Sequence, residues 1–173
     1  MTEGKISKKI ILFALPIFLG NLFQQLYNVV DSLVVGNVLG KEALAAVSST
    51  GSLIFLIVGF IHGIFVGASV IISRHFGAKN KKDLEVAVHT TIALGFIAGI
   101  IITVVGMSLT PLLLKAMGTP DDVFNNAVLY LRIYFAGGIG IAMYNATMGI
   151  FQAVGDSKHP LYYLITAAII NTV

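Results

Sequence analysis

The chain has 173 residues, of which 57% are hydrophobic and only 11% are charged, and its mean hydropathy is +0.92. Soluble domains carry about 25% charged residues, so this composition cannot cover a water-exposed surface and indicates an integral membrane protein. The formal net charge of +3 comes from residues at the predicted span ends, where topology explains them, and gives no indication of nucleic-acid binding. The chain contains no cysteine, which excludes disulfides and thiol chemistry within it.

Hydropathy predicts an all-α, polytopic membrane helix bundle that forms one transmembrane domain over residues 1–173. Four segments are long enough to cross a bilayer, and part of a fifth follows them. The expected spans are residues 10–35, 44–73, 86–114, 127–154 and 161–173. A helix needs about 20 residues to cross the hydrocarbon core, so the fifth segment is too short and we expect the chain to be truncated within it.

Basic residues are distributed unequally between the two sides of this predicted bundle. The side that holds the N-terminus carries Lys5, Lys8, Lys9, Arg74, Lys79, Lys81, Lys82 and Lys158, and the opposite side carries Lys41 and Lys115. Cytoplasmic segments of membrane proteins hold the excess of lysine and arginine. We therefore expect a multi-pass protein of the plasma membrane with a cytoplasmic N-terminus.

The first predicted span carries a stripe of four polar residues, Asn21, Gln24, Asn28 and Asp31. At about 100° per residue, their spacing places them within an arc of roughly 80° on one helix face. A charged side chain in contact with lipid costs about 2.5–3.5 kcal/mol or more. The stripe is therefore expected to face other protein or a water-filled cavity.

Asp31 is the strongest functional candidate in this stripe. In apolar surroundings its carboxyl group could gain and lose a proton in a useful pH range, and in the ionised form it could hold a hard cation such as Na⁺. The alternative is a structural hydrogen bond at the end of the span, because Asp31 lies only a few residues before the turn at Gly36.

Glycines recur every four residues in two of the predicted spans, at Gly59, Gly63 and Gly67 and again at Gly95 and Gly99. Small residues at this spacing allow helix backbones to approach closely in lipid. The pattern predicts a compact bundle but does not name the neighbouring helices.

A second polar face is predicted on the fourth span. On one straight helix, Tyr130, Tyr134, Asn145 and Gln152 project within about 60° of one another, and Arg132 points roughly the opposite way. Such a face would suit a cavity for amphipathic cations. Hydrogen bonding between helices, combined with an interfacial tyrosine belt, explains the same pattern equally well.

The histidines do not predict a cofactor. His62, His75 and His89 are spaced by 13 and 14 residues, an interval that is found between haem ligands. However, only His62 lies deep in a predicted span, and the sequence lacks a facing helix with a matching pair of histidines. The sequence also lacks a nucleotide-binding loop, a nucleophile elbow and a metalloprotease motif. We expect neither an enzyme nor a bound cofactor.

Several short motifs occur together and in order along the chain. They are LPIFLGN at 15–21, VDSLVVG at 30–36, GAKN at 77–80 and GDSKHP at 155–160. Together they resemble the multidrug and toxic compound extrusion family of secondary transporters. The resemblance covers essentially the whole chain and implies two helical lobes around a V-shaped central cavity. The chain would be an incomplete N-terminal lobe, with the C-terminal lobe missing.

The resemblance implies an antiporter that exports organic cations and other drugs in exchange for H⁺ or Na⁺. By this resemblance Asp31 and Gln24 belong to the ion-coupling site, and Asn171 matches an asparagine that takes part in cation binding. Asp31 and Asn171 are therefore the expected ligands if Na⁺ is the coupling ion. Tyr130 and Asn145 match positions where the fourth helix contributes polar groups.

Two other functions compete with this interpretation. A flippase for lipid-linked precursors with a related fold would be expected to line its cavity with several cationic residues, but Arg132 is the only basic residue inside a predicted span. A non-transporting membrane or assembly subunit would need Asp31 only for stability.

Overall fold

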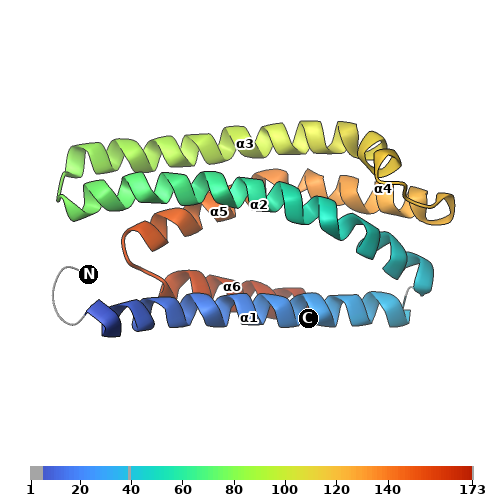
Figure 1. Cartoon of the computed structure of the whole chain (residues 1–173), viewed down its shortest axis with the longest axis horizontal. Helices are drawn as coiled ribbons and strands as arrows, with labels where there is room; N and C mark the ends of the chain where they lie inside the picture. Colours follow the sequence, from blue (N-terminus) through green and yellow to red (C-terminus); the bar gives the residue numbers. More distant parts are fainter. Residues whose placement is uncertain (1–5, 39, 173) are drawn as a thin grey trace.

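The computed structural model describes residues 6–38 and 40–172, apart from the side chains of Ile6, Lys9, Tyr27, Asp31, Lys41, Glu42, Asn171 and Thr172. All regular secondary structure in these residues is helical (Figure 1). The helices are α1 (Ile6–Val38), α2 (Lys41–Gly77), α3 (Lys81–Ala116), α4 (Asp121–Ala136), α5 (Gly138–Ala153) and α6 (Lys158–Thr172).

Three of these helices are long and apolar enough to cross a membrane, over Ile10–Val38, Ala43–Gly77 and Lys81–Ala116. Helices α4 and α5 meet this criterion only as a pair, and they are bent by 50° relative to each other. The described residues therefore hold three spans, or four if the bent pair counts as one. The predicted all-α membrane bundle is confirmed.

The connection between α2 and α3 is shorter than the interval between the predicted spans. Helix α2 continues to Gly77 and α3 begins at Lys81, whereas hydropathy leaves residues 74–85 outside both spans. Asn80 starts α3, because its Oδ1 accepts the backbone N–H of Asp83 at 3.3 Å. Hydropathy marks only the apolar part of a helix, whereas capped polar turns extend it past the hydrocarbon.

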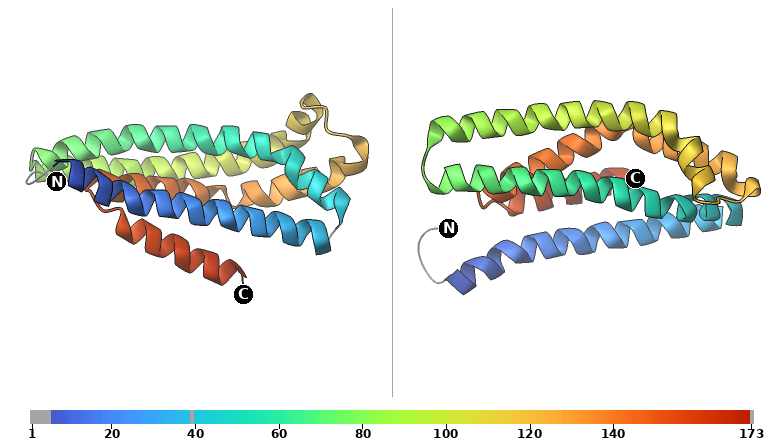
Figure 2. Two further views of the ribbon diagram at one scale, coloured as in Figure 1. Left: turned by 60° about the horizontal axis from the view of Figure 1, so that its bottom comes forward. Right: turned by 45° about the horizontal axis from the view of Figure 1, so that its top comes forward.

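Helices α2, α3, α4 and α5 form one bundle, and α1 and α6 form a pair beside it (Figure 1). Both helices of the pair run in the same direction, and Gly20 of α1 lies opposite Leu161 and Leu164 of α6. Figure 1 and the right-hand view of Figure 2 show that α1 meets α2 at their short connection and diverges from it toward the N-terminal end. The chain thus divides into a four-helix body and a two-helix pair.

Buried side chains gather in two clusters, both inside the α2–α5 bundle. The first comprises Ala46, Leu114, Val123, Ala127, Leu131 and Phe135, and the second comprises Ile61, Phe65, Ala142 and Ala146. Helix α1 differs, because its large apolar side chains are mostly exposed, as Phe18 is at 62%. The core of the described residues is therefore the four-helix body, and α1 offers apolar surface to lipid or to further protein.

The glycines of α3 allow its backbone to approach α5 and α4 closely. A Cβ atom added to Gly99 would lie 2.6 Å from the Cα of Ile139, and one added to Gly106 would lie 2.5 Å from the Cγ of Phe135. The predicted role of Gly95 and Gly99 in close packing is thus observed, with α5 as the partner. On α2 the outcome differs, because a Cβ on Gly59, Gly63 or Gly67 would meet no described atom within 4 Å.

Gly99→Ala should lower the stability of the bundle by about 1–3 kcal/mol, because the added methyl group collides with the backbone of α5. Gly63→Ala is the matched control on α2 and should leave stability unchanged or slightly raised, since alanine is the better helix former. Thermal melting of the detergent-solubilised protein measures both effects. Equal melting temperatures for the two variants would contradict the close approach of α3 and α5.

Candidate functional site

The polar stripe of α1 is exposed along the part of it that the structure describes. The side chains of Asn21, Gln24 and Asn28 are all exposed, and the Nδ2 of Asn28 donates to the Oε1 of Gln25 at 3.3 Å within the same helix. The stripe thus lies on a long apolar helix without being buried against a neighbour. Amides in this setting need water or a further polar partner.

The side chains of Asp31 and Asn171 lie outside the described part of the structure, so only their helices can be placed. Asp31 lies in α1 and Asn171 near the end of α6. Gly20 is level with Leu161 and Leu164, and both helices rise by about 1.5 Å per residue in the same direction. Following this register, the backbone of Asn171 lies about one helical turn or less from that of Asp31 along the bundle axis.

The predicted polar face of the fourth span is divided by a bend. Tyr130 and Tyr134 lie on α4, whereas Asn145 and Gln152 lie on α5, and Gly137 separates the two helices at the 50° bend. Tyr134 is half-buried against the first core cluster, with its ring edge-on to Phe135 at a centroid distance of 5.9 Å. The projection onto one straight helix is therefore wrong for this set, because the helix axis changes direction within it.

Asn145 forms a polar link between α5 and α2. Its side chain is only 9% exposed, its Nδ2 donates to the carbonyl of Ile141 at 2.8 Å, and its Oδ1 lies 3.2 Å from the Nδ1 of His62. An amide oxygen can only accept a hydrogen bond, so the Nδ1 of His62 carries the proton in this contact. In the sequence, the spacing of His62 suggests only a haem ligand and does not indicate this role. Its solitary position in the long apolar α2 was the available signal.

Arg132 bonds to a carbonyl group that a proline leaves unpaired. Pro111 has no N–H to donate to the carbonyl of Met107 four residues earlier in α3. The Nε of Arg132 on α4 donates to that carbonyl oxygen at 3.4 Å. Arg132 is exposed, and its hydrogen bond to Met107 joins α4 to α3.

The strength of this link can be measured with a double-mutant cycle. Arg132→Met should cost about 0.5–1.5 kcal/mol of stability, the usual net value of one hydrogen bond. In a Pro111→Ala background the cost should be smaller, because the introduced alanine supplies an N–H to the carbonyl of Met107 and the arginine is no longer needed there. Unfolding in denaturant gives all four values, and strictly additive effects would contradict the link.

The GDSKHP motif forms the connection between α5 and α6. Gly155 has φ of +85°, a left-handed conformation that favours glycine, and Asp156 caps α6. The Oδ1 of Asp156 accepts the backbone N–H groups of Lys158 at 3.1 Å and His159 at 3.2 Å, and its Oδ2 pairs with the Nδ1 of His159. The turn therefore explains Gly155, Asp156 and His159 of the motif.

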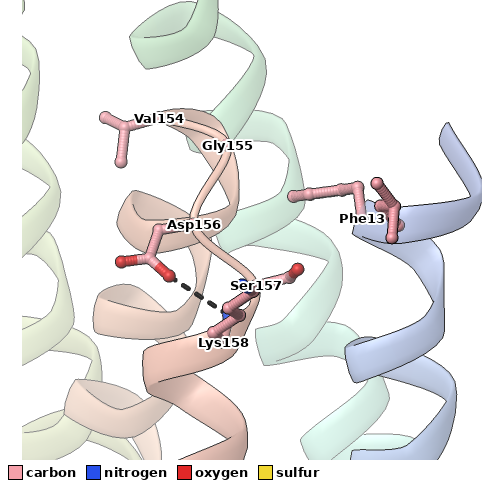
Figure 3. Close-up of a pocket in the computed structure, with 7 residues that line it drawn as sticks. Phe13, Val154, Gly155, Asp156, Ser157 and Lys158 are labelled. Atoms are coloured by element: carbon pink, nitrogen blue, oxygen red, sulfur yellow. Dashed lines mark hydrogen bonds between the residues drawn. The ribbon is translucent and has the colours of Figure 1, made fainter. Parts of the chain in front are cut away.

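This connection also lines an open pocket of about 430 Å³ beside α1. Figure 3 shows Phe13 of α1 on one side of the pocket and Gly155 and Ser157 on the other. Partial burial opposes ionisation of Asp156, yet the hydrogen bonds from His159 and Lys158 lower the pKa of its carboxyl group. The cap is thus charged at neutral pH and stabilises the first turn of α6.

Asp156→Asn should lower stability at neutral pH, because the ionised carboxylate is the better acceptor for these N–H groups. The pKa of Asp156 is lower in the folded protein than the ordinary aspartate value of 3.8. The contribution of its charge to the free energy of unfolding is therefore fully present above pH 3.8 and is lost as the pH falls through the lowered pKa. The gap in melting temperature between wild type and variant should therefore close on acidification below that value. Glu85→Gln, at an exposed position beyond the first turn of α3, is the control, and a gap that widens in acid would refute this account.

The long apolar helices, the exposed amides in one of them and the buried polar link between two others define a polytopic helical membrane protein with polar groups inside its spans. The family model described as MatE matches residues 16–173. The chain therefore belongs to the MatE family, and the resemblance found in its motifs is confirmed.

Individual relatives agree with this assignment. Over 98% of this chain's length, it is 37% identical to YoeA, a probable multidrug resistance protein of Bacillus subtilis. Over 99% of its length, it is 33% identical to YpnP, a second probable multidrug resistance protein of the same organism. A solved structure of a MOP superfamily transporter from Pyrococcus furiosus matches 97% of the chain with a TM-score of 0.88 and 31% identity. The chain spans 37% of YoeA, 39% of YpnP and 37% of the archaeal chain.

Proposed function

We propose that the chain forms part of an efflux transporter of the plasma membrane that exports organic cations in exchange for H⁺ or Na⁺. Membership of the MatE family and the names of the two Bacillus relatives support multidrug export. The observation that carries the proposal is the amide stripe of α1, exposed on a membrane-spanning helix that also holds Asp31. A water-filled cavity facing this stripe satisfies those amides.

In this proposal Asp31 binds the coupling ion, with Gln24 on the same helix face and Asn171 on the neighbouring α6. The parallel register of α1 and α6 supports the pairing, because it brings the backbones of Asp31 and Asn171 within about a helical turn along the axis. A carboxylate with an amide oxygen nearby suits either a proton or Na⁺. The coupling ion requires no further cofactor.

Ion binding at Asp31 drives the conformational change in this proposal. A ligand shifts an equilibrium between two conformations only by its differential affinity for them. Neutralising the carboxylate removes the cost of holding a charge in a dry site, and so favours the conformation in which Asp31 is away from water. Rocking of helical bodies about a site near the middle of the membrane then provides alternating access.

The exported cation would bind beside the exposed amides Asn21 and Asn28 of α1. Tyr130 and Tyr134 of α4 add to the proposed polar lining, and the buried Asn145 of α5 acts behind it through its hydrogen bond to His62. The bond from Arg132 to Met107 draws that basic group toward α3, an arrangement that does not favour capture of an anionic lipid headgroup.

Asp31→Asn in the full-length protein should abolish gradient-driven export, because the amide can neither exchange a proton nor balance the charge of Na⁺. Ethidium export from cells, measured with a proton gradient alone and with a sodium gradient alone, shows which ion drives transport in wild type. Asn37→Asp, at an exposed position where α1 ends, is a control for a changed charge and should retain export. Undiminished ion-driven export by folded Asp31→Asn would contradict the mechanism and favour a purely structural role.

A further inference from the structure

His62 occupies an unusual position in the four-helix body. Between Ala43 and Ser73 it is the only titratable side chain in the sequence of α2, and it is exposed. At a rise of 1.5 Å per residue it lies roughly 17 Å from Ser73, well inside the span. An imidazole at this depth is expected to face a polar cavity or further protein, since contact with hydrocarbon is costly.

The hydrogen bond to Asn145 fixes how His62 presents its ring. The Nδ2 of Asn145 is engaged by the carbonyl of Ile141, so its Oδ1 accepts the Nδ1–H of His62. In the neutral ring the Nε2 atom then carries a lone pair and acts as a hydrogen-bond acceptor. Asn145 is the buried partner of this pair and His62 is the exposed one, so the imidazole is the group that a ligand can reach.

No described residue covers the surface of α2 beside this ring. Gly59 lies nearly one turn before His62, and a Cβ atom added to Gly59 or Gly63 would meet no described atom within 4 Å. Phe55, which is 81% exposed, projects within about 20° of His62 two turns earlier on the same helix. An acceptor nitrogen, a small-residue gap and an aromatic ring together suit an organic cation that carries an N–H group.

We propose that His62 is a substrate-contacting residue whose Nε2 accepts a hydrogen bond from an N–H group of the exported cation, with Asn145 as its positioning residue. This inference rests on the proposed function and adds a chemical preference to it. Cations with N–H donors gain a contact at His62 that cations without donors cannot make. His62 lies outside the four motifs that carry the family resemblance.

The test compares two cations on the same variants of the full-length protein. Ethidium carries amine N–H groups, whereas tetraphenylphosphonium carries none. His62→Phe should raise the KM for ethidium by about tenfold, the effect expected from losing one hydrogen bond to a charged partner, and leave the KM for tetraphenylphosphonium nearly unchanged. His62→Gln retains an acceptor and should restore part of the ethidium affinity. Asn145→Leu should show the same selective loss as His62→Phe, because the ring is no longer held.

The two proposals fail in distinguishable ways. Because KM does not depend on the amount of protein, a variant that folds poorly lowers both rates without changing the ratio of the two KM values. If wild type exports both cations and the ratio is the same in His62→Phe and Asn145→Leu as in wild type, the role of His62 is refuted and the proposed function stands. If wild type exports neither cation, the proposed function fails and this inference fails with it. Should His62→Phe not fold, His62→Leu carries the same expectation.

Discussion

Polar groups inside a membrane bundle need partners among other protein groups or water, and this constraint explains most of the hydrogen bonds described above, although the buried hydroxyl of Thr103 has no described partner. Thr91 and Thr110 satisfy their hydroxyl groups by donating to carbonyl oxygens of the preceding turn. Asn145 is satisfied by His62 and by its own helix, and the carbonyl freed by Pro111 is satisfied by Arg132. The amides of α1 remain exposed in the described chain. The large apolar side chains of α1 are exposed as well, so this helix presents both amides and apolar surface to whatever lies beside it.

Close backbone packing explains why the helices separate into a four-helix body and a two-helix pair. Lipid tails are as apolar as leucine, so helices associate in membranes through close contact and hydrogen bonds. Gly95, Gly99 and Gly106 give α3 such contact with α5 and α4, whereas α1 touches α2 mainly near their short connection. A firmly packed body beside a loosely attached pair is the arrangement that the proposed ion-driven movement of one unit relative to the other requires. Gly40 and Gly155, both with positive φ, lie in the two connections between these units.

The fold could be predicted from sequence wherever one residue type determines the outcome locally. Apolar runs defined the long helices, whereas glycine spacing predicted a close contact correctly at Gly95 and Gly99 but not at Gly59, Gly63 and Gly67, where no described residue approaches. The bend at Gly137 could not be predicted, because paired glycines permit a bend without requiring one, and the direction of α5 is set by its contact with α3. The bond between His62 and Asn145 joins residues 83 positions apart, and no local pattern connects them. For the same reason, the sequence indicated which residue types form the candidate site, and only the structure shows how the helices that carry them are arranged.

The central claim is that the stripe of α1 faces water within the membrane. Because the chain contains no cysteine, a single cysteine placed in it is a unique label within these residues. Cysteines at Asn21, Gln24 and Asn28 should react with a water-soluble, membrane-impermeant maleimide applied to the full-length protein, whereas cysteines at Phe18, Leu26 and Val29 should react far more slowly. Equal labelling of the two sets, or protection of the stripe alone, would contradict the account.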